Sequence, residues 1–329
     1  MAKIFVTRKI PGDHLDKLSQ AGHEVEVSDV SRALTPEELL DKVKGVDGLL
    51  CLLTDHIDGD LMDAAGPQLK VIANYAVGFD NIDMKAATDR QICVTNTPCD
   101  EVNEAVAELT WALMLSISRR IVEADEATRR GGYKGWEPDI FLGTDLIGKT
   151  LGIVGLGRIG SMVARRAKGY NMTVLYNKRS PDPEAEEELG VIFSSLDELL
   201  AKSDIVSLHV PLTEETRHMI NKDTLGKMKK GSFLVNTARG AIVDEHDLVE
   251  ALKSGQLAGA GLDVYDNEPN IDPELIVMPN TITTPHIASA TYSARNKMGT
   301  MAVDGLIDAF SGKKPQNMVN EEIWETRRK

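Results

Sequence analysis

The sequence feature that most constrains the fold is the glycine pattern G-x-G-x-x-G at residues 155–160. A short apolar run at 150–154 precedes it and is typical of a buried parallel strand. Apolar side chains at helical spacing follow over 158–170, and a second apolar run occupies 172–176. Strand, glycine turn, helix and strand form the context that a dinucleotide-binding fingerprint requires, whereas three glycines alone would fit an ordinary βα turn.

Each glycine of this pattern has a predicted role. Gly155 permits the tight turn, Gly157 has no Cβ to block a pyrophosphate, and Gly160 lets helix and strand pack closely. The first-turn N–H groups of the helix then point at the phosphates. The residues between the glycines that belong to the same predicted cofactor site are Leu156, Arg158 and Ile159.

Length, charge and cysteine content narrow the class of protein. A chain of 329 residues is long enough for two domains with a core each. The net charge of −14 argues against a general binder of nucleic acids or anionic membranes. Three cysteines without zinc spacing suit reduced thiols, and a predicted strand at residues 3–7 leaves no room for a signal peptide. We therefore expect a cytoplasmic protein with no membrane span and no metal site.

Strand and helix patterns alternate along most of the chain, which predicts parallel α/β sheets. In the first ~98 residues, a glycine-bearing loop at 75–80 follows a strand, at the edge where such sheets bind ligands. It could equally be a plain βα connection. Residues 103–130 predict one long helix, which would span ~40 Å at 1.5 Å per residue. The alternation resumes at residue 150, and a last helix is predicted at 292–310.

Three charged or titratable residues follow three different predicted strands of one sheet. Arg239 stands between Ala238 and Gly240, and its planar guanidinium suits a carboxylate. His286 could act as a general acid, with Glu268 as the carboxylate that holds its tautomer and favours its protonated form. Each also has an ordinary structural interpretation: a surface arginine, a buried histidine and a turn residue. The histidines that we expect to be exposed polar positions are His14, His23, His56, His218 and His246.

The residues after the second strand of the fingerprint unit predict which nicotinamide cofactor is used. NAD-binding domains place an Asp or Glu there, about 20 residues after the fingerprint, on the ribose 2′-OH. Here the sequence reads Asn177, Lys178, Arg179 and Ser180, so the acid is missing and two cations follow. This favours NADP(H) over NAD(H), while an exposed basic turn balanced by acids at 182–188 is the alternative.

Six stretches in one order resemble the D-isomer-specific 2-hydroxyacid dehydrogenase family over nearly the whole chain, and most closely its glyoxylate/hydroxypyruvate reductases. The stretches are residues 103–108, 155–160, 209–213, 236–240, 263–269 and 285–289. The resemblance implies a flavodoxin-like substrate domain (1–98 plus 289–329) interrupted by a dinucleotide-binding Rossmann domain (99–288). It also implies a homodimer built through the Rossmann domains and the helix after Asn103.

The resemblance further implies residue roles. Arg239 would bind the substrate carboxylate and polarise the keto oxygen, His286 would protonate that oxygen, and Glu268 would hold His286. The N–H groups of Val77 and Gly78 would grip the carboxylate. The remaining implied contacts are Leu53 in the substrate pocket and, for the cofactor, Val106, His209, Val210, Pro211, Thr216, Thr237, Ala238, Asp263 and Ala288.

Two alternatives stay open at this stage. One is another dehydrogenase of the family, acting on D-lactate, 2-ketogluconate or phosphite. Formate is disfavoured because the formate dehydrogenases carry Gln in place of Glu268. The other is a non-catalytic, nucleotide-sensing scaffold like the dehydrogenase-related corepressors, which can keep the same three residues.

Overall fold

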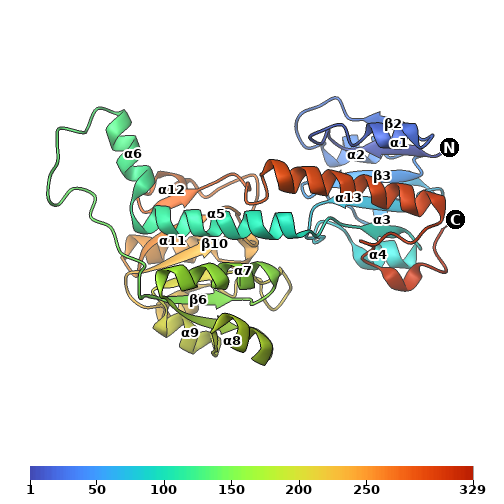
Figure 1. Cartoon of the computed structure of the whole chain (residues 1–329). Coiled ribbons are helices and arrows are strands. Elements are labelled where there is room, and N and C mark those ends of the chain that lie inside the picture. The colour runs from blue at the N-terminus through green and yellow to red at the C-terminus, as the bar shows by residue number, and fades with distance from the viewer. Residues whose placement is uncertain (329) are drawn as a thin grey trace. The chain divides into compact units, whose positions relative to one another are not determined.

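The structure is a computed structural model that describes residues 1–328, and it divides into two compact units (Figure 1). Unit 1 comprises Met1–Val102 and Ala290–Lys329, and unit 2 comprises Asn103–Ser289. The sequence predicts these boundaries at 98/99 and 288/289. Within the described residues, no helix combines the length and the apolar character that crossing a membrane requires.

Unit 1 is built on a five-stranded parallel sheet in the order β2-β1-β3-β4-β5, the flavodoxin-like order. Its strands are β1 (Lys3–Val6), β2 (Glu24–Val27), β3 (Gly48–Leu52), β4 (Val71–Tyr75) and β5 (Cys93–Thr95). Its helices are α1 (Asp16–Gln20), α2 (Pro36–Lys42), α3 (Gly59–Ala65), α4 (Met84–Asp89), α13 (Tyr292–Ser311) and the 3-10 turn η3 (Glu321–Ile323).

Local sequence signals explain several of these helices. Thr35 and Glu38 form a capping box at the start of α2, and Asp58 caps α3 through the N–H of Leu61. α13 ends at Gly312, which adopts left-handed backbone with φ of 79°. Although α13 follows unit 2 in the chain, it packs against β4 and belongs to unit 1.

Unit 2 is built on a seven-stranded parallel sheet in the order β12-β11-β10-β9-β6-β7-β8, the doubly wound order of dinucleotide-binding folds. Its strands are β6 (Thr150–Val154), β7 (Thr173–Asn177), β8 (Ile192–Phe193), β9 (Ile205–Leu208), β10 (Ser232–Asn236), β11 (Leu257–Leu262) and β12 (Thr281–Thr283). The predicted fold class, α/β with two Rossmann-like units, is confirmed.

The helices of this part of the chain begin with α5, which straddles the unit boundary. They are α5 (Asp100–Ser118), α6 (Ile121–Arg129), α7 (Arg158–Ala167), α8 (Pro183–Leu189), α9 (Leu196–Lys202), α10 (Lys222–Lys227), α11 (Glu245–Lys253) and α12 (Pro273–Val277). The short 3-10 turns are η1 (Lys168–Tyr170) and η2 (Gly240–Ile242).

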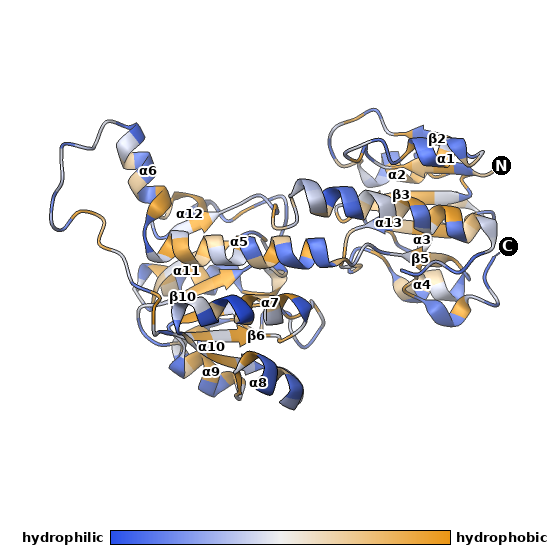
Figure 2. Ribbon diagram, viewed as in Figure 1, coloured by the Kyte–Doolittle hydropathy of each residue, from blue (hydrophilic) through white to orange (hydrophobic). Residues whose placement is uncertain are grey.

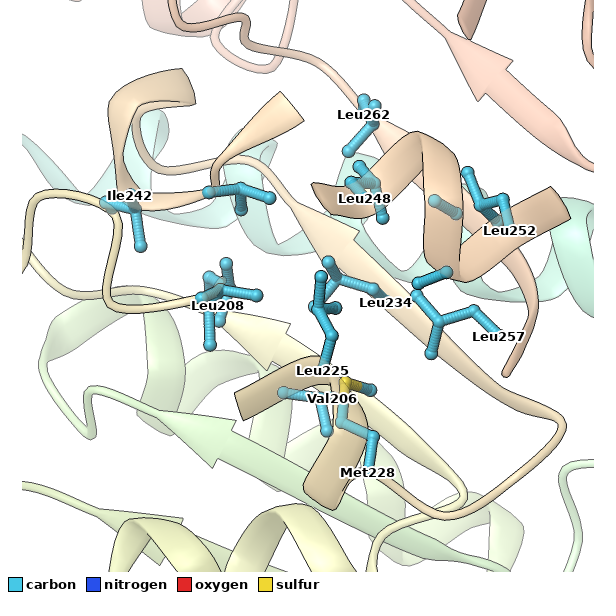
Figure 3. Close-up of a cluster of buried hydrophobic side chains, with 14 of the residues drawn as sticks. Val206, Leu208, Leu225, Met228, Leu234, Ile242, Leu248, Leu252, Leu257 and Leu262 are labelled. Atoms are coloured by element: carbon cyan, nitrogen blue, oxygen red, sulfur yellow. The ribbon is translucent and has the colours of Figure 1, made fainter. Parts of the chain in front are cut away.

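The two faces of the unit 2 sheet pack against different helices, because successive side chains of a strand point to opposite sides. Ile153 enters a cluster with α5 and α7, whereas Val154 enters one with α9, α10 and α11. Figure 3 shows the second cluster, where Leu225 of α10, Met228 directly after α10 and Leu248 of α11 lie beside strand side chains. Strands buried on both faces are near-continuously apolar, as Figure 2 shows.

The prediction of one continuous helix over 103–130 is wrong. α5 ends at Ser118 and α6 begins at Ile121, because Arg120 between them has left-handed backbone with φ of 54°. The carbonyl of Ser118 accepts from the N–H of Thr144 at 2.8 Å. A Cβ on Gly143 would lie 2.6 Å from the same carbonyl oxygen, so the returning chain packs directly on the end of α5. The helix therefore breaks because of a tertiary contact. The sequence has no Gly or Pro at residues 119–120 from which the break could be predicted.

The prediction that five histidines are exposed is wrong for His14, whose surface is only 5% exposed. Its imidazole packs on α13 at Gly299, where a Cβ would collide with the ring. His23 and His218 are half-buried. The two that are exposed, as predicted, are His56 and His246.

Candidate active site

The predicted residues of unit 2 gather at one edge of its sheet, because all seven strands are parallel and their carboxyl ends coincide there. The glycine turn follows β6, residues 177–180 begin at the last residue of β7, and residues 209–211 follow β9. Arg239 follows β10, Glu268 lies in the loop after β11, and His286 follows β12. Open α/β sheets bind their ligands at this edge.

The glycine turn has the backbone that the fingerprint predicts. Gly155 has φ of 101°, and a Cβ there would lie 2.7 Å from backbone atoms of His209 and Val210. A Cβ on Gly160 would collide with the carbonyl oxygen of Gly155, so α7 can approach β6 only with glycine at this position. A Cβ on Gly157, the N-cap of α7, would meet nothing within 4 Å. The first turn of α7 therefore borders open space in which a pyrophosphate can sit.

His286 and Glu268 form a hydrogen-bonded pair. Nδ1 of His286 lies 2.8 Å from Oε2 of Glu268, and their side chains are 25% and 28% exposed. The other carboxylate oxygen, Oε1, accepts from the N–H of Tyr265 at 3.0 Å. Burial alone would raise the pKa of Glu268, but the hydrogen bond and charge of His286, the Tyr265 N–H and the charge of Arg239 together lower it. Ionised Glu268 engages Nδ1, which leaves Nε2 as the nitrogen that can exchange a proton with a ligand.

Asp263 holds the loop that carries His286. This buried carboxylate accepts from the N–H groups of Ile287 and Ala288 at 2.9 and 2.7 Å and from the Thr284 hydroxyl at 2.6 Å. The N–H of His286 donates to the Asp263 carbonyl at 2.9 Å. These bonds keep His286 in left-handed backbone with φ of 53°, a conformation that costs a residue with a side chain about 1–3 kcal/mol. Burial raises the pKa of Asp263 in spite of its hydrogen bonds.

Arg239 lies at the start of η2, in a turn that Asn236 organises. Oδ1 of Asn236 accepts from the Ala238 N–H at 3.0 Å, and its Nδ2 donates to the Arg239 carbonyl at 2.8 Å. Nη1 of Arg239 donates to the Ala238 carbonyl at 2.7 Å. A Cβ on Gly240 would overlap the backbone of Tyr265. Residue 240 must therefore be glycine, because the Arg239 turn contacts the loop that carries Glu268 there. This contact cannot be predicted from the sequence.

The end of β7 carries the predicted cofactor-selecting residues. Nδ2 of Asn177 donates to the Ser194 carbonyl at 3.0 Å. Nζ of Lys178 pairs with Asp182 at 2.8 Å, so this cation already has an acidic partner. The two residues that follow are exposed: Arg179 and Ser180. Of the two predicted cations, Arg179 is thus the more accessible to a ligand phosphate.

The loop after β9 is fixed by its own side chains. The hydroxyl of Thr216 donates to the Pro211 carbonyl at 2.7 Å and accepts from the Thr213 N–H at 2.8 Å. Burial lowers the pKa of His209 to about 4, and its Nε2 lies 2.8 Å from the Ser207 hydroxyl. The His209 ring is therefore neutral at physiological pH. The other predicted cofactor residues of unit 2 are Val106 on α5, Leu156, Arg158 and Ile159 at the glycine turn, and Val210, Thr237, Ala238 and Ala288 after their strands.

The three predicted substrate residues of unit 1 lie at the carboxyl edge of its own sheet. Leu53 follows β3, and Val77 and Gly78 lie in the loop after β4. Their loop is anchored by amide side chains, since Nδ2 of Asn96 donates to the Val77 carbonyl at 2.7 Å and Nδ2 of Asn74 to the Gly78 carbonyl at 2.9 Å. Between residues 1 and 328, neither the Val77 nor the Gly78 N–H donates to another group. Two anchored N–H groups of this kind suit an anion.

Sequence reasoning missed what Asp263 and Asn236 do for the loops beside them. The only available signal was their position at the end of an apolar strand, which does not reveal that their side chains turn back onto the backbone. In residues 1–328, no group of three or more His, Cys, Asp or Glu side chains is placed to hold a metal ion.

Comparison with known proteins places these features in a wider context. The profile of the NAD-binding domain of D-isomer specific 2-hydroxyacid dehydrogenases matches residues 111–288. A glyoxylate reductase of Thermococcus kodakarensis is 49% identical over 330 residues, which cover 99% of this chain and 98% of the relative. A solved structure from Thermus thermophilus has a TM-score of 0.91 at 47% identity, covering 96% of this chain and 99% of the other. An NADPH-dependent glyoxylate/hydroxypyruvate reductase of Sinorhizobium meliloti has a TM-score of 0.84 at 33% identity, covering 100% of both chains.

Proposed function

The chain belongs to the D-isomer specific 2-hydroxyacid dehydrogenase family, and on that premise we propose that it reduces glyoxylate to glycolate and, as a second substrate, hydroxypyruvate to the D-2-hydroxy acid. The observation that carries the proposal is the 2.8 Å contact between His286 and Glu268 at the sheet edge that also holds the glycine turn. A held imidazole beside a nucleotide site is what carbonyl reduction needs from the protein.

The chemistry divides between cofactor and chain. A reduced nicotinamide, held through the glycine turn at Gly157, supplies the hydride when bound. Arg239 binds the substrate carboxylate with its planar guanidinium and polarises the keto oxygen. His286 donates the Nε2 proton to that oxygen, while Glu268 holds the ring through Nδ1.

Substrate recognition in this proposal also uses unit 1. The N–H groups of Val77 and Gly78 bind the carboxylate, and Leu53 contacts the substituent on the keto carbon. A panel of 2-keto acids that includes 2-ketogluconate, with D-lactate and phosphite assayed in the oxidative direction, tests this assignment. We expect glyoxylate to give the highest kcat/KM. A higher value for another compound would reassign the substrate, and no turnover with any would favour the nucleotide-sensing scaffold.

We further propose that the enzyme prefers NADP(H). No acid stands at the end of β7 to repel a 2′-phosphate, and exposed Arg179 and Ser180 can bind it. Lys178 would first have to leave Asp182, so it contributes less than Arg179. Charge-assisted hydrogen bonds are worth about 1.5–3 kcal/mol each, and two would give a preference on the order of a hundredfold or more.

Steady-state kinetics with both cofactors test this preference. Asn177→Asp combined with Arg179→Ala should shift the ratio of kcat/KM with NADPH to kcat/KM with NADH strongly toward NADH. The double variant introduces the acid that NAD-binding domains carry and removes the cation. Arg165→Ala, an exposed arginine on α7, is the matched control and should leave the ratio unchanged. Equal or better kcat/KM with NADH in the unmodified enzyme would refute the preference.

The same family resemblance leads us to propose a homodimer. α6 and the chain that follows it project from the rest of unit 2 (Figure 1) and carry large apolar side chains at the surface. They include Ile121, Tyr133, Trp136, Leu142 and Ile147. An exposed apolar set of this size is typical of an interface. Analytical ultracentrifugation should give twice the chain mass, and Trp136→Ser with Leu142→Ser should shift it toward the monomer.

A further inference from the structure

A cluster of charged groups lies beside the proposed active site and takes no part in the chemistry described above. Its centre is His218, in the loop after β9. Nε2 of His218 lies 2.9 Å from Oδ2 of Asp266, and its Nδ1 lies 3.9 Å from Asp244. Like His286, His218 has left-handed backbone, with φ of 49°. Residues with side chains adopt this conformation only where surrounding contacts enforce it.

The backbone around His218 is bonded to the turn that follows Arg239. The N–H of His218 donates to the carbonyl of Ala241 at 2.8 Å, and the N–H of Ile220 donates to the carbonyl of Ile242 at 3.1 Å. In return, the N–H of Asp244 donates to the Ile220 carbonyl at 2.8 Å. The loop after β9 and η2 therefore form a short paired segment immediately after Arg239.

The side chain of His218 reaches the loop that carries Glu268. Its partner Asp266 lies two residues before Glu268, and the N–H of Asp266 donates to Oε1 of Glu245 at 2.7 Å. Nη1 of Arg217 lies 3.9 Å from Oδ1 of Asp266. Asp266 is thus fixed through its side chain by His218 and Arg217 and through its backbone by Glu245 at the start of α11.

We propose that His218 is a positioning residue that joins three segments of the site: the loop after β9, the Arg239 turn and the Glu268 loop. This inference rests on the proposed function, because it concerns how Glu268 is held against His286. His218 touches none of the reacting groups. When its bond to Asp266 is lost, the Glu268 loop loses one of its side-chain anchors, and the carboxylate is no longer kept within 2.8 Å of Nδ1 of His286.

His218→Leu removes both ring nitrogens at similar size, and His218→Gln keeps one donor for Asp266. His246→Leu, at an exposed position on α11, is the matched control. We expect His218→Leu to lower kcat for glyoxylate about tenfold, which corresponds to about 1.4 kcal/mol. The KM for glyoxylate should stay near that of the control, because the bonds from residues 218 and 220 to the turn after Arg239 are backbone bonds that do not need the ring. His218→Gln should restore most of kcat.

Hydrogen exchange gives a readout independent of turnover. The amides of Tyr265 and Asp266 should exchange faster in His218→Leu and in Asp266→Asn, which serves if the leucine variant fails to fold. A His218→Leu enzyme with the kcat and the exchange of the control would overturn the positioning role. A loss of kcat without faster exchange at Tyr265 and Asp266, and without rescue by Gln, would also overturn it. A wild-type enzyme that turns over no 2-keto acid would instead refute the proposed function itself.

Discussion

Replacing Glu268 by Gln removes one charge from the site and changes little else. The side chain keeps its length and its oxygen, so the N–H of Tyr265 still has an acceptor. What is lost is the charge-assisted bond from Nδ1 of His286, which is 2.8 Å long and only about a quarter exposed to solvent. The variant therefore isolates the electrostatic contribution of Glu268 to His286.

The size of the effect follows from the two kinds of hydrogen bond. A bond to a charged partner contributes about 1.5–3 kcal/mol, against about 0.5–1.5 kcal/mol for a neutral one. The difference is about 1–1.5 kcal/mol, and about 1.4 kcal/mol corresponds to a factor of ten in rate. Because the carboxylate holds the imidazole that donates the proton, its loss should lower kcat/KM for glyoxylate about tenfold.

The assay is kcat/KM for glyoxylate reduction, followed by the absorbance of the reduced nicotinamide. Glu268→Asp keeps the charge on a shorter side chain and serves as the companion variant, with a smaller loss of kcat/KM expected. Cofactor affinity, measured by fluorescence titration, should be unchanged in both. A Glu268→Gln enzyme with the kcat/KM of the unmodified enzyme would refute the electrostatic role of Glu268.

Three further predictions concern other parts of the site. Gly157→Ala should fold normally but raise the KM for the cofactor, because a Cβ at residue 157 meets no protein atom within 4 Å. Gly160→Ala should lower the melting temperature, because a Cβ at residue 160 collides with the carbonyl oxygen of Gly155. Arg239→Lys keeps the charge but loses the planar fork, so kcat/KM for glyoxylate should fall sharply, and parity with the unmodified enzyme would exclude Arg239 as the carboxylate anchor. Burial lowers the pKa of His209 from 6.5 in the unfolded chain to about 4 in the folded chain. Between these two pH values only the unfolded chain binds the proton, so the free energy of unfolding decreases as the pH drops from 6.5 to about 4. In denaturant unfolding, His209→Gln should show a smaller decrease of this free energy over the same pH range.

The parts of the fold that sequence predicts well are those encoded locally. The strand at Thr150–Val154 and the glycine turn that follows it depend on short-range patterns, and the structure has both at the predicted residues. The break at Arg120 and the burial of His14 depend on contacts from residues far along the chain, Gly143 and Gly299. No local pattern encodes them.

The same division holds at the candidate site. The order of the motifs is enough to predict that Glu268 and His286 lie near each other, and the structure places them in contact. It does not predict that Asp263 ties down the His286 loop, or that Gly240 is needed for contact with the backbone of Tyr265. These depend on how loops from neighbouring strands meet in three dimensions.

In the proposed function, His286 donates the proton in a nicotinamide-dependent reduction of glyoxylate. The most direct test compares kcat for glyoxylate reduction in the unmodified enzyme and in His286→Ala, with cofactor binding measured on the same samples. Loss of a positioned proton donor should lower kcat by ~10²–10⁴ while the cofactor dissociation constant stays the same. Near-normal kcat in His286→Ala would contradict the account.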